Sequence, residues 1–504
     1  MSLREAVAIR SDIGDRQTSW FYAALLSLVF GTLTLLMFSE LGVSLVLTLA
    51  LCLLLIGVDG VHWIRGRFDT FDPQGIVGVF GIHFYVAAPL LHVLLDYWAQ
   101  LAMPSEGWLP SLERSIWFNF AGLVLYRIVV SLGSRRPAAQ GQKVAIDPQA
   151  FRTIAWAGAA FSFVFFAAFV MSRGGPVAYF LLVSEDKSSL EGSGWLILLG
   201  EAFPLLALAA TLIGGRVRLR RHAVLLGVVI LIFVTAQFLV GGLRGSRSNT
   251  IWPVIIGLGM IHMLVRPIRS RNLVAAGLVG VVFMYGYSFY KGAGTDALGL
   301  LTGETTTSEL SQETGRSFDG LLLGDFGRSD VQALVLSRSE AGEIDHAFGH
   351  TYAGDLAIVT PPIVRETLPP PKTYWVTEAW FGRGAADSGF RSSRIVGAAG
   401  EATLNFGATG FLLSFGVVGF IVRRASAWYR ATAVGDDLGR KIIAGSACIV
   451  CILALGSDLD NLVWFAAKQL LPLFFVVSLT RSLSKRQASQ TYAGREPALG
   501  SSRS

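Results

Sequence analysis

Two arginines in a glycine-rich segment are the first residues whose types and spacing suggest chemistry. Arg244 and Arg247 lie in the run Gly241-Gly242-Leu243-Arg244-Gly245-Ser246-Arg247-Ser248-Asn249, directly before an apolar segment. A guanidinium binds phosphate through two parallel hydrogen bonds, and the N-terminus of a helix that starts here also favours an anion. We therefore predict that Arg244, Ser246 and Arg247 bind an anion. The alternative is that the arginines contact lipid headgroups.

A second group of polar residues precedes a later apolar segment. Arg391 and Arg394 are followed by Glu401 and Asn405. The two arginines can turn back over the start of that segment, and a carboxylate that is partly desolvated there suits a general base. Glu401 is therefore a candidate base. An acidic residue near a helix N-terminus can equally serve to stabilise the helix dipole.

Two further pairs have the spacing of metal ligands. His346 and His350 have the i, i+4 spacing that places two imidazoles on one helix face, but Gly349 interrupts the segment and favours a hydrogen-bonding role for His350. Asp458 and Asp460 can hold a divalent cation beside a phosphate, although a polar turn between two apolar segments is the simpler interpretation. The sequence therefore predicts no metal and no cofactor.

The composition indicates which elements must position these residues. The chain has 504 residues, of which 52% are hydrophobic and 15% charged, and its mean hydropathy is +0.54. Soluble domains carry about 25% charged residues, so we predict an all-α polytopic membrane protein. The net charge of +7 is spread along the chain, which argues against a nucleic-acid partner. Twelve segments have the length and apolar character of membrane spans; they lie near residues 20–38, 41–58, 75–95, 115–133, 152–171, 195–214, 223–242, 250–265, 273–291, 403–422, 442–456 and 462–480.

The basic residues orient these spans. Lys and Arg concentrate in alternate connecting segments, beginning with the N-terminal residues, and the positive-inside rule places those segments in the cytoplasm. A long acidic segment lies outside and has no span-length apolar run; loops of this length are typically functional. Within it, residues 328–342 have the pattern of a short amphipathic helix. We therefore predict a cytoplasmic tail at 1–19, a nine-helix region at 20–291, a large extracytoplasmic loop at 292–402, a three-helix region at 403–480 and a disordered cytoplasmic tail at 481–504.

With these features the sequence resembles the O-antigen polymerases, the Wzy-type family of oligosaccharide repeat-unit polymerases. The resemblance rests on the number of spans and on the large outside loop three helices from the end. It also rests on three stretches, which are Phe348-Gly349-His350-Thr351-Tyr352, Thr360-Pro361-Pro362-Ile363-Val364-Arg365 with Pro371-Lys372 after it, and Gly400-Glu401-Ala402-Thr403-Leu404-Asn405-Phe406-Gly407.

The resemblance implies a glycosyltransferase C-like fold in the cell inner membrane and a metal-independent, inverting glycosyl transfer on its outer face. The donor would be a growing glycan on undecaprenyl pyrophosphate, and the acceptor a single lipid-linked repeat unit. His350 or Glu401 would remove the acceptor proton, while Arg365, Tyr352 and Asn405 would join the arginines in binding substrate. Membrane lipids, a chain-length regulator and a flippase would be its partners.

Two other functions remain open on the sequence. An O-antigen ligase uses the same lipid-linked donor and has a similar number of spans, but it transfers the glycan to the sugar core of lipid A. A flippase or exporter of lipid-linked glycans would need polar residues along a path through the membrane. The predicted spans contain few such residues, which are Arg127, Glu201, Gln237, Lys291 and Lys468.

Overall fold

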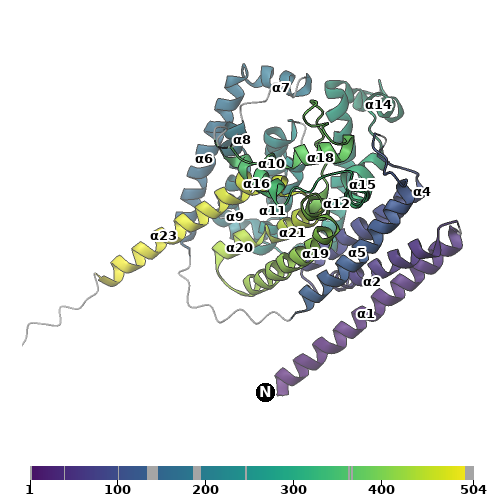
Figure 1. Ribbon diagram of the computed structural model, residues 1–504. Helices are drawn as coiled ribbons and strands as arrows, with labels where there is room; N and C mark the ends of the chain where they lie inside the picture. The colour runs from purple at the N-terminus through teal and green to yellow at the C-terminus, as the bar shows by residue number, and fades with distance from the viewer. Residues whose placement is uncertain are drawn as a thin grey trace, which may run out of the picture. The chain divides into compact units, whose positions relative to one another are not determined.

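The structure is a computed structural model that describes residues 3–38, 40–99, 101–132, 146–185, 194–244, 247–360, 364 and 367–493. All regular secondary structure within these residues is helical (Figure 1). The chain divides into two compact units. The first unit comprises Met1–Arg135, Ile268–Tyr429 and Ala447–Trp464, and the second comprises Arg136–Pro267, Arg430–Ser446 and Phe465–Ser504.

Ten helices in the described part of the chain are long and apolar enough to cross a membrane, and they coincide with ten of the twelve predicted spans. The two other predicted spans are also helices. The helix α5 (Trp108–Ser131) carries charged residues that include Arg127, and α11 (Ser248–Leu264) has only 17 residues. These helices are those of an α-helical polytopic membrane protein, the class that the composition predicts.

The first unit is built on helices that share one apolar core. Its N-terminal helices are α1 (Leu3–Met37), α2 (Val43–Ile64), α3 (Pro73–Ile82), which continues through the π-helical η1 (His83–Ala87) into α4 (Ala88–Leu94), and α5. The side chain of Asp72 caps α3 by accepting a hydrogen bond from the Gln74 N–H at 3.0 Å, which satisfies a donor that the helix leaves without an internal partner.

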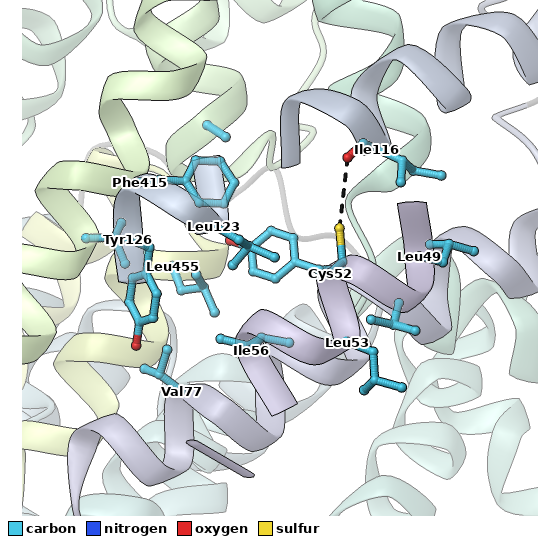
Figure 2. Packing of buried hydrophobic residues seen from close by; sticks show 14 of the residues in the cluster. Leu49, Cys52, Leu53, Ile56, Val77, Ile116, Leu123, Tyr126, Phe415 and Leu455 are labelled. Carbon is cyan, nitrogen blue, oxygen red and sulfur yellow. Dashed lines mark hydrogen bonds between the residues drawn. The ribbon is translucent and has the colours of Figure 1, made fainter. Parts of the chain in front are cut away.

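The core of this unit joins α2, α3 and α5 to α19 (Gly397–Val434) and α21 (Ala447–Gly456). Figure 2 shows Cys52 of α2 beside α5, where its Sγ lies 4.0 Å from the Ile116 carbonyl oxygen. A Cβ at Gly122 would overlap the Phe415 ring, so glycine allows α5 and α19 to approach closely. The labelled members of the cluster are Leu49, Cys52, Leu53, Ile56, Val77, Ile116, Leu123, Tyr126, Phe415 and Leu455.

The predicted outside loop folds as part of the first unit and has its own apolar cluster. Its helices are α14 (Thr307–Thr314), α15 (Ser329–Glu340), α16 (His350–Leu356) and α18 (Lys372–Phe381), which follow α12 (Ser270–Ala293) (Figure 1). The predicted helix over 328–342 is confirmed as α15, but the prediction that it is amphipathic is wrong, because eight of the nine residues from 329 to 337 are buried and cover all faces of the helix. Its buried side chains pack with those of α18 and the start of α19; the cluster includes Val331, Leu334, Val335, Val376, Trp380, Val396 and Leu404.

The second unit contains a set of helices in which two are interrupted by π-helical turns. The π-helices are η3 (Phe238–Gly242), at the end of α10 (Ala223–Gln237), and η7 (Ala466–Leu470), which leads into α23 (Leu471–Ala493). Such turns occur frequently at functional sites. The remaining helices are α6 (Pro148–Ser172), α7 (Pro176–Glu185), α8 (Gly194–Gly200), α9 (Phe203–Arg221), α11 and α20 (Leu438–Ala444).

Candidate functional site

Two helix N-termini in the first unit are capped by carboxylates that come from other segments. Asp458 accepts hydrogen bonds from the backbone N–H groups of Val396 and Gly397, at 3.0 and 2.6 Å, where α19 begins. Glu401 of α19 in turn accepts one from the Leu459 N–H at 2.8 Å, where α22 (Leu459–Phe465) begins. Each of these carboxylates therefore accepts hydrogen bonds from N–H groups that lack a partner within their own helix, and its negative charge lies at the positive end of that helix dipole.

Asp355 of α16 extends this arrangement to a third helix. One of its carboxylate oxygens accepts from the Lys372 N–H at the start of α18, at 3.0 Å, and the other accepts from the Asp460 N–H at 3.1 Å. Burial raises the pKa of Asp355 to about 6, although the hydrogen bond from the Lys372 N–H acts to lower that pKa. The N-termini of α18, α19 and α22 therefore converge on Asp355, Asp458 and Glu401, which we call the carboxylate network.

Lys372 supplies the positive charge inside this network. Its side chain is 2% exposed, and its Nζ lies 2.5 Å from Asp458 Oδ2 and 3.2 Å from Asp460 Oδ2. Burial disfavours the ammonium, but the charges of Asp458 and Asp460 outweigh that effect and raise the pKa of Lys372 above its usual range. Burial also raises the pKa of Asp458, and the Lys372 charge opposes that rise. The prediction that Asp458 and Asp460 form a simple polar turn is therefore wrong for Asp458, which is a buried ion-pair partner.

Glu401 and Asn405 are joined by hydrogen bonds to the segment that carries His350. The Thr351 hydroxyl donates to Glu401 at 3.0 Å and accepts from the Asn405 side-chain amide at 2.6 Å. The Asn405 side-chain oxygen accepts from the Gly349 N–H at 2.7 Å. Two of the stretches that carry the family resemblance, 348–352 and 400–407, are thus held side by side.

The two candidate bases differ in their access to solvent. Glu401 is 1% exposed, and each of its carboxylate oxygens already accepts a hydrogen bond. The side chain of His350 is exposed at the first residue of α16. His346 does not share a helix with it, because φ is positive at Phe348 and Gly349, and its Nε2 lies 3.0 Å from the Ser339 hydroxyl. The structure therefore offers His350, rather than Glu401, to an incoming molecule.

The arginines of the first unit make contacts within their own loop. The Arg391 guanidinium donates to the carbonyl oxygens of Ala386 and Phe390, at 2.6 and 2.7 Å. The guanidinium carbon of Arg394 lies 5.1 Å from the centroid of the Trp380 ring, a cation–π contact. Both side chains are exposed. Tyr352, the other predicted binding residue in this unit, is partly buried, and its ring centroid lies 6.4 Å from that of Phe406.

A cation cluster lies in the second unit. The Glu201 carboxylate contacts the guanidinium of Arg244 and lies 2.8 Å from Lys468 Nζ, and all three side chains are buried. Lys468 also donates to the Asn249 side-chain oxygen at 3.1 Å, while the Gln237 side chain donates to the Asn249 carbonyl at 2.8 Å. Arg244 follows the π-helical η3 and Lys468 lies within η7.

The predicted anion-binding segment is described in part. Arg244 joins the cation cluster, and Arg247, which directly precedes α11, is 9% exposed. Ser246 and Arg365 lie outside the described residues. Arg244 and Arg247 belong to the second unit, whereas Arg391 and Arg394 belong to the first.

Sequence reasoning missed Lys372 and the pairing of Lys468 with Glu201. Ionisable residues within apolar spans are rare and usually functional, so Glu201 and Lys468 already carried a signal, although nothing in their spacing indicated that they pair. Lys372 lies in a stretch that supports the family resemblance, but its partner Asp458 is 86 positions away.

The helices define the chain as an α-helical polytopic membrane protein, and among its described residues the carboxylate network lies in the first unit and the cation cluster in the second. No protein-family model, curated protein or solved structure matches the chain.

Proposed function

We propose that this protein is a membrane-embedded inverting glycosyltransferase that joins polyprenyl-pyrophosphate-linked oligosaccharides into a surface polysaccharide on the outer face of the inner membrane. The observation that carries the proposal is the cation cluster, in which the buried side chains of Arg244 and Lys468 both contact the carboxylate of Glu201. Ionisable side chains buried among apolar helices are rare and usually mark a functional site. A pyrophosphate on a lipid carrier is the ligand that fits it.

In the proposed reaction the acceptor hydroxyl attacks the anomeric carbon of the donor sugar from the face opposite the pyrophosphate. The bond between that carbon and the phosphate oxygen breaks, and its electron pair leaves with the pyrophosphate. Cations placed at the leaving group stabilise the negative charge that develops there. The proton of the acceptor hydroxyl passes to a general base.

We assign the base to His350 and a positioning role to Glu401. His350 is exposed, whereas Glu401 is enclosed and holds Thr351, the next residue of α16, through the 3.0 Å hydrogen bond. In this assignment Glu401 fixes the orientation of the first turn of α16 and therefore of the imidazole. The base and the cation cluster are assigned from separate units, and each assignment is tested by its own variants.

The experiment for the cation cluster uses purified protein in proteoliposomes with lipid-linked repeat units as both donor and acceptor. We expect Lys468→Met and Arg244→Ala to slow polymer formation about 10- to 100-fold, because each removes a charged hydrogen bond to phosphate. Arg220→Ala is the matched control, since this arginine is exposed in the same unit. Formation of polymer also separates the proposed activity from a ligase, which needs a lipid A-core acceptor, and from a flippase, which forms no bond.

A double variant separates a substrate role from simple neutralisation of Glu201. Lys468→Met removes one of the cations that compensate the negative charge of Glu201, and adding Glu201→Gln removes that negative charge. If the cations serve only to neutralise Glu201, the double variant regains the wild-type rate, and the proposed pyrophosphate site is wrong. If they bind pyrophosphate, the double variant regains stability while transfer stays slow.

A further inference from the structure

Two exposed phenylalanines lie where the backbone of the first unit departs from regular geometry. Phe348 has a φ of +47° and is 74% exposed. Phe406 lies at the kink of α19, with a φ of −138°, and is 47% exposed; Gly407 after it has a φ of +63°. Left-handed backbone is unfavourable for a phenylalanine and persists where the surrounding structure imposes it. Burial of the ring does not explain this conformation, because the ring is exposed.

Hydrogen bonds hold these two positions on adjacent segments. The Phe348 N–H donates to the Asn405 carbonyl at 3.1 Å, and the Ala347 N–H donates to the Leu404 carbonyl at 2.9 Å. The Asn405 side chain, which is fully buried, fixes the following N–H of Gly349. Asn405, which holds the segment of Phe348, is also linked through Thr351 to Glu401. Both phenylalanines therefore lie on hydrogen-bonded backbone.

The surroundings of these rings are polar. His350 is exposed two residues after Phe348. Three residues before Phe348, Asp345 is 73% exposed and forms an ion pair with Arg383 at 2.9 Å. A surface that faces lipid tails would not carry an exposed ion pair three residues from Phe348 in the sequence. The ligand for this surface therefore has both apolar and hydrogen-bonding parts.

We propose that Phe348 and Phe406 form a stacking surface for one pyranose ring of the glycan, beside His350. The C–H faces of a pyranose are apolar and its rim carries hydroxyls. The His346 ring lies 6.0 Å from the Phe348 ring, so an aromatic face with an imidazole next to it matches both parts of the sugar. Aromatic side chains offer a large, rigid contact face. This inference rests on the proposed function and adds to it the place where the glycan, rather than the lipid carrier, is held.

The test measures sugar binding without requiring transfer. The probe is the oligosaccharide released by mild acid from polyprenyl-linked glycans of the producing cells, added to purified full-length protein in nanodiscs. Selective saturation of aromatic protons in NMR should transfer to C–H protons of one sugar residue. We expect Phe348→Leu and Phe406→Leu to weaken binding about two- to tenfold, the range for loss of an aromatic contact, and Phe348→Tyr to keep it.

Phe390→Leu is the control, because Phe390 is 53% exposed in the same loop and its ring contacts Phe381 instead. If the wild-type protein forms polymer but both leucine variants bind the oligosaccharide as tightly as it does, the stacking surface is wrong and the proposed function stands. If the wild-type protein neither binds the oligosaccharide nor forms polymer, both are wrong. Unchanged sugar binding with poorer insertion into membranes would identify the rings as lipid anchors and would also overturn the inference.

Discussion

Replacing Lys372 with methionine removes the positive charge at the centre of the carboxylate network while keeping an apolar stem. The Lys372 Nζ lies 2.5 Å from Asp458, whose side chain is fully buried, so the variant leaves that carboxylate without its ion-pair partner. Losing one partner of a buried pair costs roughly 3–5 kcal/mol, against a total of about 5–15 kcal/mol for a typical domain. The substitution should therefore remove a large fraction of the stability of the first unit.

The assay is thermal unfolding of the purified protein in nanodiscs at pH 8, followed by tryptophan fluorescence. We expect Lys372→Met to lower Tm by about 5 °C or more. Adding Asp458→Asn should recover part of that loss, because the asparagine oxygen still accepts the N–H groups of Val396 and Gly397 and position 458 no longer carries a buried charge.

The control for this prediction is Lys291→Met, at an exposed lysine in the last turn of α12 in the same unit. Its Tm should stay close to that of the wild-type protein. The reasoning is refuted if Lys372→Met leaves Tm unchanged, or if the double variant is no more stable than the single one, because either result would mean that the ammonium does not compensate Asp458.

Three further predictions concern pH, catalysis and topology. The pKa of Asp355 is about 6 in the folded protein and about 3.9 in the unfolded chain. Its contribution to the stability of the fold is therefore complete below pH 4 and is lost as the pH rises through 6. Asp355→Asn should flatten the dependence of Tm on pH between pH 4 and pH 6. His350→Ala should slow transfer about 100-fold or more, whereas Glu401→Gln should lower the rate less; the opposite order of the two effects would make Glu401 the base. Ser308→Cys, in α14, should react with an impermeant thiol reagent in intact cells, and labelling only after lysis would overturn the predicted orientation.

The parts of the fold that follow from local sequence could be predicted. A membrane span is defined by its own composition, so ten of the predicted spans coincide with observed helices. The position of α15 could also be predicted, but its burial on all faces comes from neighbouring helices that the local pattern does not contain. The two other predicted spans, α5 and α11, are helices, but they are not among the ten that are long and apolar enough to cross a membrane. Arg127 lowers the apolar character of α5, although the residue is satisfied there by an ion pair with Asp59 at 2.9 Å.

The candidate site could be predicted only in part, because its contacts join distant segments. Glu401 and Asn405 could be selected from residue type and position, yet Glu401 caps the N-terminus of α22 rather than that of its own helix. Hydropathy and spacing carry no information about which carboxylate a buried lysine meets. The partners of Lys372 and Lys468 therefore required the structure.

The carboxylate network also explains why the long segment after α12, which we predict to lie outside, belongs to the same unit as several of the spans. Asp355 and Lys372 come from the loop, whereas Glu401 and Asp458 come from α19 and the turn before α22. Each helix N-terminus carries roughly half a positive charge, and in this network a carboxylate from another segment satisfies it. Detaching the loop would leave both the buried N–H groups and the carboxylates without hydrogen-bond partners, at a cost of about 1–3 kcal/mol for each unsatisfied group. The proposed transfer between lipid-tethered glycans would need a loop held in this way, because the tether would fix the depth at which the reacting sugar meets the protein.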